Sequence, residues 1–226
     1  MGLFNWQEIR GLQQPLADLR TSPDNTVWQA CLLAIVAGYA DAVGFLAFNA
    51  FAGAMTGNTV LLGIALAGGN LFDAAQSAGI IAAFVLGVAA SAVLRRYVPL
   101  AVLLGIEAAA IVAAALALPL VAAPVLAFAM GVQNATMTHF AGTTLNTVFL
   151  TGNLQKLVEI LLKRDAGSRP TSEGIAITLL GRLWLAYLVG VVLGAAAWNW
   201  TAYPLLLALL PLAAVLSRKA AWRRDG

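Results

Sequence analysis

Long apolar stretches, separated by short polar breaks, dominate the pattern of hydrophobic and polar positions along this chain. A helix needs about 20 apolar residues to cross a hydrocarbon core about 30 Å thick. Six stretches come close to that length: 27–49, 74–94, 98–118, 122–140, 174–197 and 201–217. Two shorter ones, 53–68 and 145–162, lie between them. Strands of a membrane barrel would alternate apolar and polar residues instead. The pattern therefore predicts an all-α integral membrane protein.

The composition and the placement of charge agree with this prediction. The chain has 226 residues, of which 61% are hydrophobic and 10% are charged, whereas soluble domains carry about 25% charged residues. Most basic residues gather at breaks between apolar stretches: Arg95, Arg96, Lys163, Arg164, Arg169, Arg218, Lys219, Arg223 and Arg224. Such clusters mark cytoplasmic loops. No basic face with interleaved aromatic residues remains for nucleic acid, so the expected partner is the lipid bilayer.

The two ends of the chain differ from the apolar region, which is expected to form a single membrane domain. Residues 1–26 are expected to lie in the cytoplasm, either as an amphipathic helix on the membrane surface or as a tail without regular structure. Pro15 falls inside the amphipathic pattern and would kink or break such a helix. Residues 218–226 are expected to form a basic cytoplasmic tail.

The two short apolar stretches share a tripeptide. Thr56-Gly57-Asn58 and Thr151-Gly152-Asn153 each follow one long stretch and precede two more. The preceding stretches align so that Asp41 falls opposite Asn134. We therefore expect two repeats, 27–121 and 122–217, because internal repeats of this kind underlie many transporter folds.

The topology follows from whether the two short stretches span the membrane. If each enters and returns on one side as a short re-entrant or broken helix, about six transmembrane helices remain and the repeats are inverted. If both span, there are eight spans and the repeats are parallel. The six-span alternative places every basic cluster and both termini in the cytoplasm, whereas the eight-span alternative places Arg95 and Arg96 outside.

Parts of the chain resemble a known family. The stretches Gly38–Phe45 and Met55–Val60, then Gly63 and the second tripeptide at Thr151–Asn153, are similar to the YoaK-like family of bacterial membrane proteins, a domain of unknown function. The resemblance covers about residues 27–217. It implies a location in the bacterial inner membrane and an all-helical bundle. It implies no activity, since none is well established for that family.

The tripeptides are the first candidate for a binding site. Thr and Asn are favoured as helix N-caps and Gly permits a sharp turn. A half-helix that begins at Thr56, Gly57 and Asn58, and another at Thr151, Gly152 and Asn153, would present free N–H groups near the midplane. We expect such termini to bind a small polar solute or ion. The alternative is that both are ordinary turns at the membrane surface.

Three further polar residues lie within apolar stretches. Asp41 and Asn134 are expected to line the same site as the tripeptides, and Glu107 lies near the middle of 98–118. Ionisable groups at such depth usually face a cavity or a partner. Glu107 is a proton-coupling candidate, because burial disfavours the ionised form of a carboxyl group. The alternative for each carboxyl group is a structural role.

No motif indicates a catalytic residue, a cofactor or a metal site. The chain lacks the common nucleophile, zinc-protease and phosphate-loop motifs, and Cys31 is its single cysteine. The sequence thus favours a transporter of a small polar solute or ion over an enzyme. An intramembrane enzyme acting on a lipid or isoprenoid and a non-transporting scaffold subunit remain alternatives. Gly87, Ser91, Gly190 and Gly194 suit close helix packing, either between repeats or in a homo-oligomer.

Overall fold

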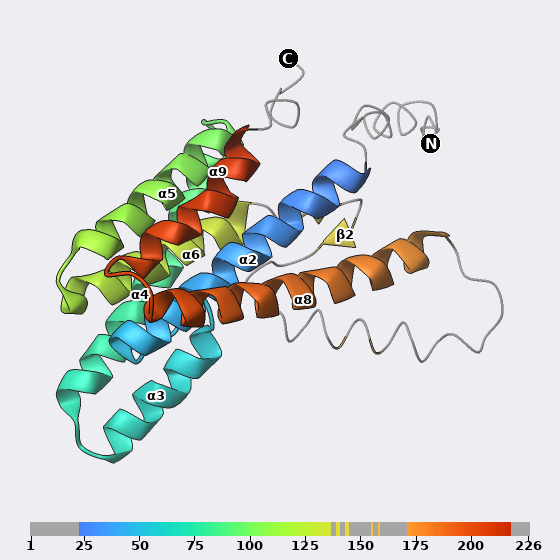
Figure 1. Cartoon of the computed structure of the whole chain (residues 1–226). Coiled ribbons are helices and arrows are strands. Elements are labelled where there is room, and N and C mark those ends of the chain that lie inside the picture. Colours follow the sequence, from blue (N-terminus) through green and yellow to red (C-terminus); the bar gives the residue numbers. More distant parts are fainter. Residues whose placement is uncertain are drawn as a thin grey trace, which may run out of the picture.

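Helices form nearly all of the regular structure in the computed structural model, which describes residues 23–136, 139–140, 143–144, 155, 158 and 171–217 (Figure 1). The helices are α2 (Pro23–Phe48), α3 (Met55–Ala67), α4 (Leu71–Leu94), α5 (Leu100–Leu116), α6 (Pro119–Thr136), α8 (Thr171–Trp198), the 3₁₀ helix η2 (Pro204–Ala208) and α9 (Leu209–Ser217). Two short strands, β1 (His139–Phe140) and β2 (Thr143–Thr144), pair antiparallel.

Four of these helices are long and apolar enough to cross a membrane. Their candidate spans are Val27–Phe48, Leu71–Leu94, Pro119–Thr136 and Leu179–Trp198. Shorter apolar helices cover Met55–Ala67, Leu100–Leu116 and Pro204–Ser217. These helices fit a multi-pass membrane protein, as the apolar stretches predicted.

Two predicted boundaries were wrong. The stretch 122–140 was expected to be helical throughout, but α6 ends at Thr136 and His139–Phe140 is a strand. The stretch 201–217 was expected to form one long helix, but it is divided into η2 and the nine-residue α9. Pro204 at the start of η2 and Pro211 within α9 explain this division, because proline lacks an N–H group and clashes with the preceding turn.

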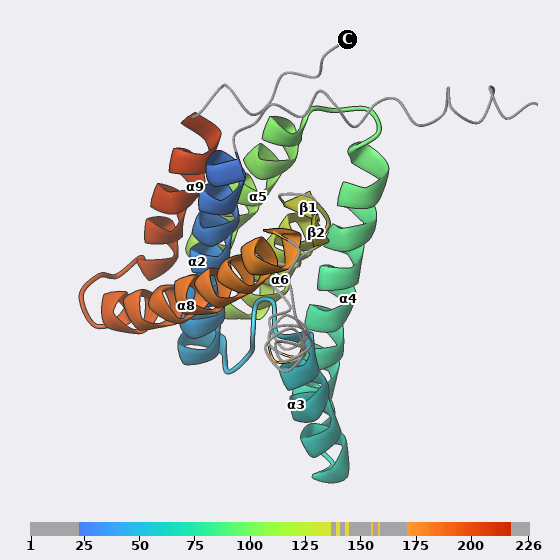
Figure 2. The ribbon, with the colours of Figure 1, turned by 90° about the vertical axis from the view of Figure 1, so that its right-hand side faces the viewer.

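The ends of the helices sort into two groups. The start of α2, the connection between α4 and α5, and the end of α9 lie at one end of the molecule (Figure 2). The turn between α3 and α4 lies at the opposite end (Figure 2). Gly68 and Gly69 form that turn, and Gly69 has a φ of +72°, a conformation that suits glycine.

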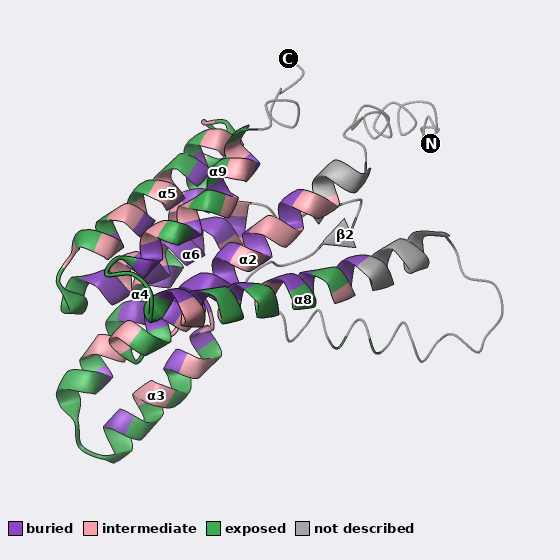
Figure 3. Cartoon of the chain, viewed as in Figure 1, coloured by how far each residue is buried: buried purple, intermediate pink, exposed green. Residues whose placement is uncertain are grey.

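The interior is built mainly from α2, α5, α6 and α9, whereas α3, α4 and α8 carry broad exposed apolar faces (Figure 3). The main packed pairs are α2 with α8, α4 with α6, and α5 with α6. Exposed apolar side chains on α4 and α8, such as Val85, Leu86, Leu188 and Val192, suit contact with lipid tails.

Glycines bring α2 and α8 into backbone contact. A Cβ atom at Gly38 would overlap the carbonyl oxygen of Tyr187, and a Cβ atom at Gly190 would overlap the carbonyl oxygen of Ile35. Small residues allow this approach, which gives membrane helices close van der Waals packing. The two backbones therefore touch at glycine positions on both helices.

The contact between α4 and α6 has the same form. A Cβ atom at Gly87 would overlap the carbonyl oxygen of Phe128, and a Cβ atom at Gly131 would overlap the carbonyl oxygen of Phe84. The Ser91 and Thr136 hydroxyl groups lie 3.0 Å apart farther along this pair. The packing role expected for Gly87, Ser91 and Gly190 is thus met between helices of one chain.

Candidate functional site

The loop between α2 and α3, residues 49–54, turns back into the bundle. The Asp41 carboxylate oxygen Oδ1 accepts hydrogen bonds from the N–H groups of Gly53 at 2.6 Å and Ala54 at 3.3 Å. Asp41 lies seven residues before the end of α2 at Phe48, which is about 10 Å back along the helix axis. Helix α3 therefore starts beside the interior of α2, and Ala52, Gly53 and Met55 around its start are buried.

Asp41 also ties this loop to α8. The Tyr187 hydroxyl group donates a hydrogen bond of 2.6 Å to Asp41 Oδ2. The Asp41 side chain is 3% exposed, and both of its oxygens accept hydrogen bonds. A buried carboxylate is tolerated when it is hydrogen-bonded in this way. Asp41 thus joins α2, the loop 49–54 and α8 at one point.

Asn58 fastens the same loop from α3. Its Nδ2 donates to the carbonyl oxygen of Phe51 at 2.7 Å, and its Oδ1 accepts from the N–H group of Phe51 at 2.9 Å. The Asn58 side chain is fully buried. An amide side chain carries one donor group and one acceptor, and here both serve a single backbone residue.

Gly57 provides room for the Phe51 ring. A Cβ atom at Gly57 would lie 2.6 Å from Phe51 Cδ2, closer than a side chain could sit. The Phe51 ring also stacks on Phe45 of α2, with ring centroids 5.0 Å apart. Gly57 and Asn58 of the tripeptide therefore have a local structural role, since both hold Phe51 in place.

The predicted capping of α3 by Thr56 or Asn58 is wrong. Ala54 occupies the N-cap position and no side chain caps the helix. The N–H groups of Met55, Gly57 and Asn58 bond to the carbonyl oxygens of Gly53 and Ala54, so the expectation that they stay free for a solute is also wrong. The loop's own carbonyl groups reach these donors because it folds back at this point. Thr56 is exposed in the first turn.

Glu107 has no hydrogen-bond partner in the part of the chain that the structure describes. Its side chain is 0% exposed, and neither Oε1 nor Oε2 has a partner. It belongs to the buried stripe of α5, with Leu103, Leu104, Ile111 and Ala114. Helix α5 packs on α6, η2 and α9. Burial of a polar group without a hydrogen bond is costly, so this carboxyl group is a candidate for a functional role.

Asn134 also presents an unused oxygen. Its Oδ1 atom is buried and has no partner among the described residues. The neighbouring Gln133 differs, because its Nε2 donates to the carbonyl oxygen of Leu33 at 2.9 Å and thereby ties α6 to α2. Asn134 is the α6 residue that aligns with Asp41 of α2, and its side chain does not share the hydrogen-bond pattern of Asp41.

The structure divides the predicted site residues into groups. Asp41, Gly57 and Asn58 all hold the loop 49–54, whereas among the described residues no hydrogen bond links Glu107 or Asn134 to that loop. The second tripeptide, Thr151, Gly152 and Asn153, lies outside the described residues. Phe51 and Tyr187 were not among the predicted site residues. The spacing of the motif could not identify them, because Phe51 contacts Asn58, and Tyr187 contacts Asp41, only in the folded chain.

A cleft of about 530 Å³ opens beside this loop, between the end of α2, α3 and α4. Its polar lining is formed by Asn49, Asn70, Asp73, Gln76 and Ser77. A second cavity of about 230 Å³ lies between α2, α5 and η2, near Trp198 and Tyr203. Ligand pockets commonly fall between about 300 and 1,000 Å³. The first cleft is thus large enough for a small solute.

Comparisons with known proteins give a family and no activity. A family model described as protein of unknown function (DUF1275) matches residues 29–217. No curated protein and no solved structure matches the chain. The match supports the expected class, a family of unknown function; the narrower YoaK-like label stays a prediction.

Proposed function

We propose that this chain, which belongs to the DUF1275 family of proteins of unknown function, is a transporter of a small polar solute or ion in the bacterial inner membrane. The observation that carries the proposal is the non-helical loop 49–54, which Asp41 and Asn58 hold inside an apolar bundle. Irregular backbone at membrane depth is tolerated where it is buried in protein or lines a cavity. Transporters place their binding sites at helices interrupted in this manner.

The proposed architecture has six spans and two inverted repeats, with both termini in the cytoplasm. Support comes from the two glycine contacts. Gly38 of α2 contacts Tyr187 of α8, and Gly131 of α6 contacts Phe84 of α4 in the same way. Likewise, Ile35 of α2 contacts Gly190 of α8, and Phe128 of α6 contacts Gly87 of α4. Corresponding contact residues of α2 and α6 lie 93 positions apart in the sequence, and those of α4 and α8 lie 103 positions apart. Each repeat would therefore pack its first helix against the third segment of the other.

The direction of the helices also supports inversion. Helix α2 begins at the end of the molecule where α4 connects to α5 (Figure 2). Helix α6 follows α5 after a short turn and runs back toward that end (Figure 1). Helices α2 and α6 thus run in opposite directions. Helix α3 leaves the bundle on the side where α2 ends, which is the course of a re-entrant segment.

In this proposal the site residues have three kinds of role. Asp41 shapes the loop through hydrogen bonds from Gly53 and Ala54. Asn58 hydrogen-bonds Phe51, and Gly57 leaves room for the Phe51 ring. Thr56 and Asn134 would contact the solute, together with the second tripeptide at Thr151, Gly152 and Asn153. Glu107 is the proposed proton-coupling group, since a lone carboxyl group in an apolar core can hold a proton.

Reconstitution into liposomes tests the proposal. We expect the protein to accelerate uptake of at least one member of a panel of small polar solutes and ions, and Asn58→Ala to abolish that uptake. Asn199→Ala is the matched control, because Asn199 is exposed and its amide bonds only to the local carbonyl oxygen of Ala195. Absence of uptake for every member of the panel would favour a scaffold, and consumption of a lipid in place of uptake would favour an enzyme.

A further inference from the structure

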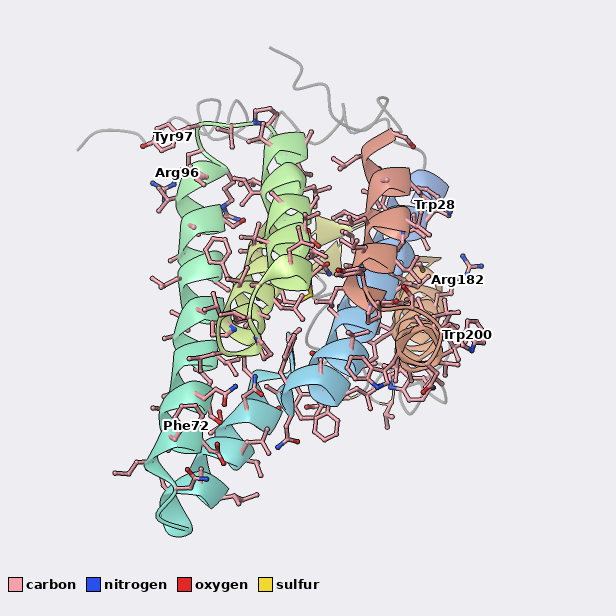
Figure 4. The ribbon with its side chains drawn as sticks, turned by 60° about the vertical axis from the view of Figure 1, so that its left-hand side comes forward. Trp28, Phe72, Arg96, Tyr97, Arg182 and Trp200 are labelled. Atoms are coloured by element: carbon pink, nitrogen blue, oxygen red, sulfur yellow. The ribbon has the colours of Figure 1, made fainter. Side chains whose placement is uncertain are left out.

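The polar groups inside the bundle bear on the charge of the transported solute. Among residues 27–136 and 179–217, the buried charged side chains are the carboxyl groups of Asp41 and Glu107, and no basic side chain is buried. The described arginines, Arg95, Arg96 and Arg182, are exposed, and Figure 4 shows Arg96 and Arg182 on the outside of the bundle. An anion would therefore meet carboxyl groups and no compensating positive charge in this part of the interior.

Most N–H groups around the start of α3 are satisfied from within the protein. A helix N-terminus attracts anions through its free N–H groups. Here Asp41 Oδ1 accepts from Gly53 and Ala54, and the N–H groups of Met55, Gly57 and Asn58 bond to loop carbonyl oxygens. The carboxylate of Asp41 thus occupies the place that an anionic solute would take.

The atoms that remain without partners are acceptors. Within the described residues they include both carboxyl oxygens of Glu107 and Oδ1 of Asn134, all fully enclosed. When Glu107 is ionised, its oxygen atoms bind hydrogen-bond donors or cations and repel anions, and the amide oxygen of Asn134 accepts hydrogen bonds. A solute that carries N–H groups or a positive charge would provide the partners that these oxygen atoms lack.

The cleft beside the loop has the same character. Its lining contains the carboxylate of Asp73, three amide side chains and the hydroxyl group of Ser77, and no lysine or arginine. Asn70 Nδ2 donates to Asp73 Oδ2 at 2.6 Å, which leaves the second Asp73 oxygen available to a ligand. A negative charge at the mouth of a cleft raises the local concentration of cations.

We infer that the transported solute is a small cation with N–H donors, of the ammonium or amine class, and that Glu107 is the carboxyl group that receives it. This inference rests on the proposed transport function. Asp73 and the amide groups of the cleft attract the cation, and the loop 49–54 keeps anions away from the start of α3. Within the described residues, the interior offers phosphate, sulfate and carboxylate solutes no buried basic side chain.

Proteoliposome uptake of radiolabelled probes tests this inference. The probes are methylammonium as the cation, acetate and phosphate as anions, and glycerol as the neutral solute. We expect saturable uptake of methylammonium and no protein-dependent uptake of the two anions. Glu107→Gln keeps the size of the side chain and removes its charge, so it should lower methylammonium uptake by at least about tenfold. Gly105→Ala is the control on the same helix, since a Cβ there meets nothing within 4 Å.

The outcomes separate the two proposals. Uptake of acetate, phosphate or glycerol without uptake of methylammonium would overturn the cation inference and leave the transporter proposal standing. Methylammonium uptake that is unchanged in folded Glu107→Gln would overturn the assignment of Glu107. Absence of protein-dependent uptake for every probe, with protein that is correctly inserted, would overturn both.

Discussion

The Asn58 side chain hydrogen-bonds both backbone polar groups of Phe51: Nδ2 donates to the carbonyl oxygen at 2.7 Å, and Oδ1 accepts from the N–H group at 2.9 Å. This relationship holds the loop 49–54 against the start of α3, where Asp41 fastens the next residues from the other side. Loop and helix therefore form one unit.

Asn58→Ala should destabilise the protein by about 2 kcal/mol, because it leaves a partly buried donor and a partly buried acceptor of Phe51 without the partners that Asn58 provides. Thermal unfolding in detergent, followed by circular dichroism, measures the change. Asn199→Ala serves as the control, since that side chain is exposed. Two variants of equal stability would show that the Asn58 amide does not hold the loop.

Gly57→Ala should cost about 1–3 kcal/mol, because the new methyl group overlaps the Phe51 ring and overpacking is destabilising. Gly63→Ala in the same helix is the matched control. A Cβ at Gly63 meets nothing within 4 Å, so this change should be neutral or stabilise by up to about 1 kcal/mol. The difference between their unfolding midpoints measures the contact. A second change, Phe51→Leu, should restore part of the loss.

Gly38→Ala and Gly131→Ala should each destabilise by at least about 2 kcal/mol, since each methyl group meets a backbone carbonyl that cannot turn aside. Similar losses are expected from the two changes, because the two contacts have the same form. Gly79→Ala on α4 is the control, as a Cβ there has open space. Guanidinium or thermal unfolding of all three gives the comparison. A harmless Gly131→Ala beside a severe Gly38→Ala would argue against matched repeats.

Glu107→Leu should raise the free energy of unfolding by about 1–3 kcal/mol while it abolishes transport. Leucine is close to glutamate in size, and the change removes a buried polar group that has no partner among the described residues. Thermal unfolding and the uptake assay on one preparation measure the two effects together. A less stable Glu107→Leu protein would mean that the carboxyl group is satisfied in the membrane.

Phe72 and Arg96 lie near opposite ends of α4 (Figure 4), which makes them markers for orientation. In a Cys31→Ser background, Phe72→Cys should react with an impermeant maleimide on intact cells. Arg96→Cys should react only after the cells are opened, because clustered arginines favour the cytoplasmic side. The reverse pattern would place Arg96 outside and contradict the proposed orientation of the six spans.

The sequence by itself determined the class of the protein and the position of most helices. Apolar stretches near 20 residues have few alternatives to membrane helices, and the short apolar stretch 53–68 corresponds to α3, Met55–Ala67. The shared tripeptide and the alignment of Asp41 with Asn134 predict two repeats, and the repeats stay a prediction. Local composition is enough for such conclusions because they depend on the length and spacing of apolar residues.

Only the tertiary structure decided what the motif residues contact. Tyr187 lies 146 residues from Asp41 along the chain, yet its hydroxyl group bonds that carboxylate. Asn58 was expected to cap α3, and it holds Phe51 because the loop turns back beside it. Whether a buried polar atom finds a partner depends on which helices approach it. The spacing of residues could not separate the hydrogen-bonded carboxylate of Asp41 from the carboxyl group of Glu107, which has no partner among the described residues.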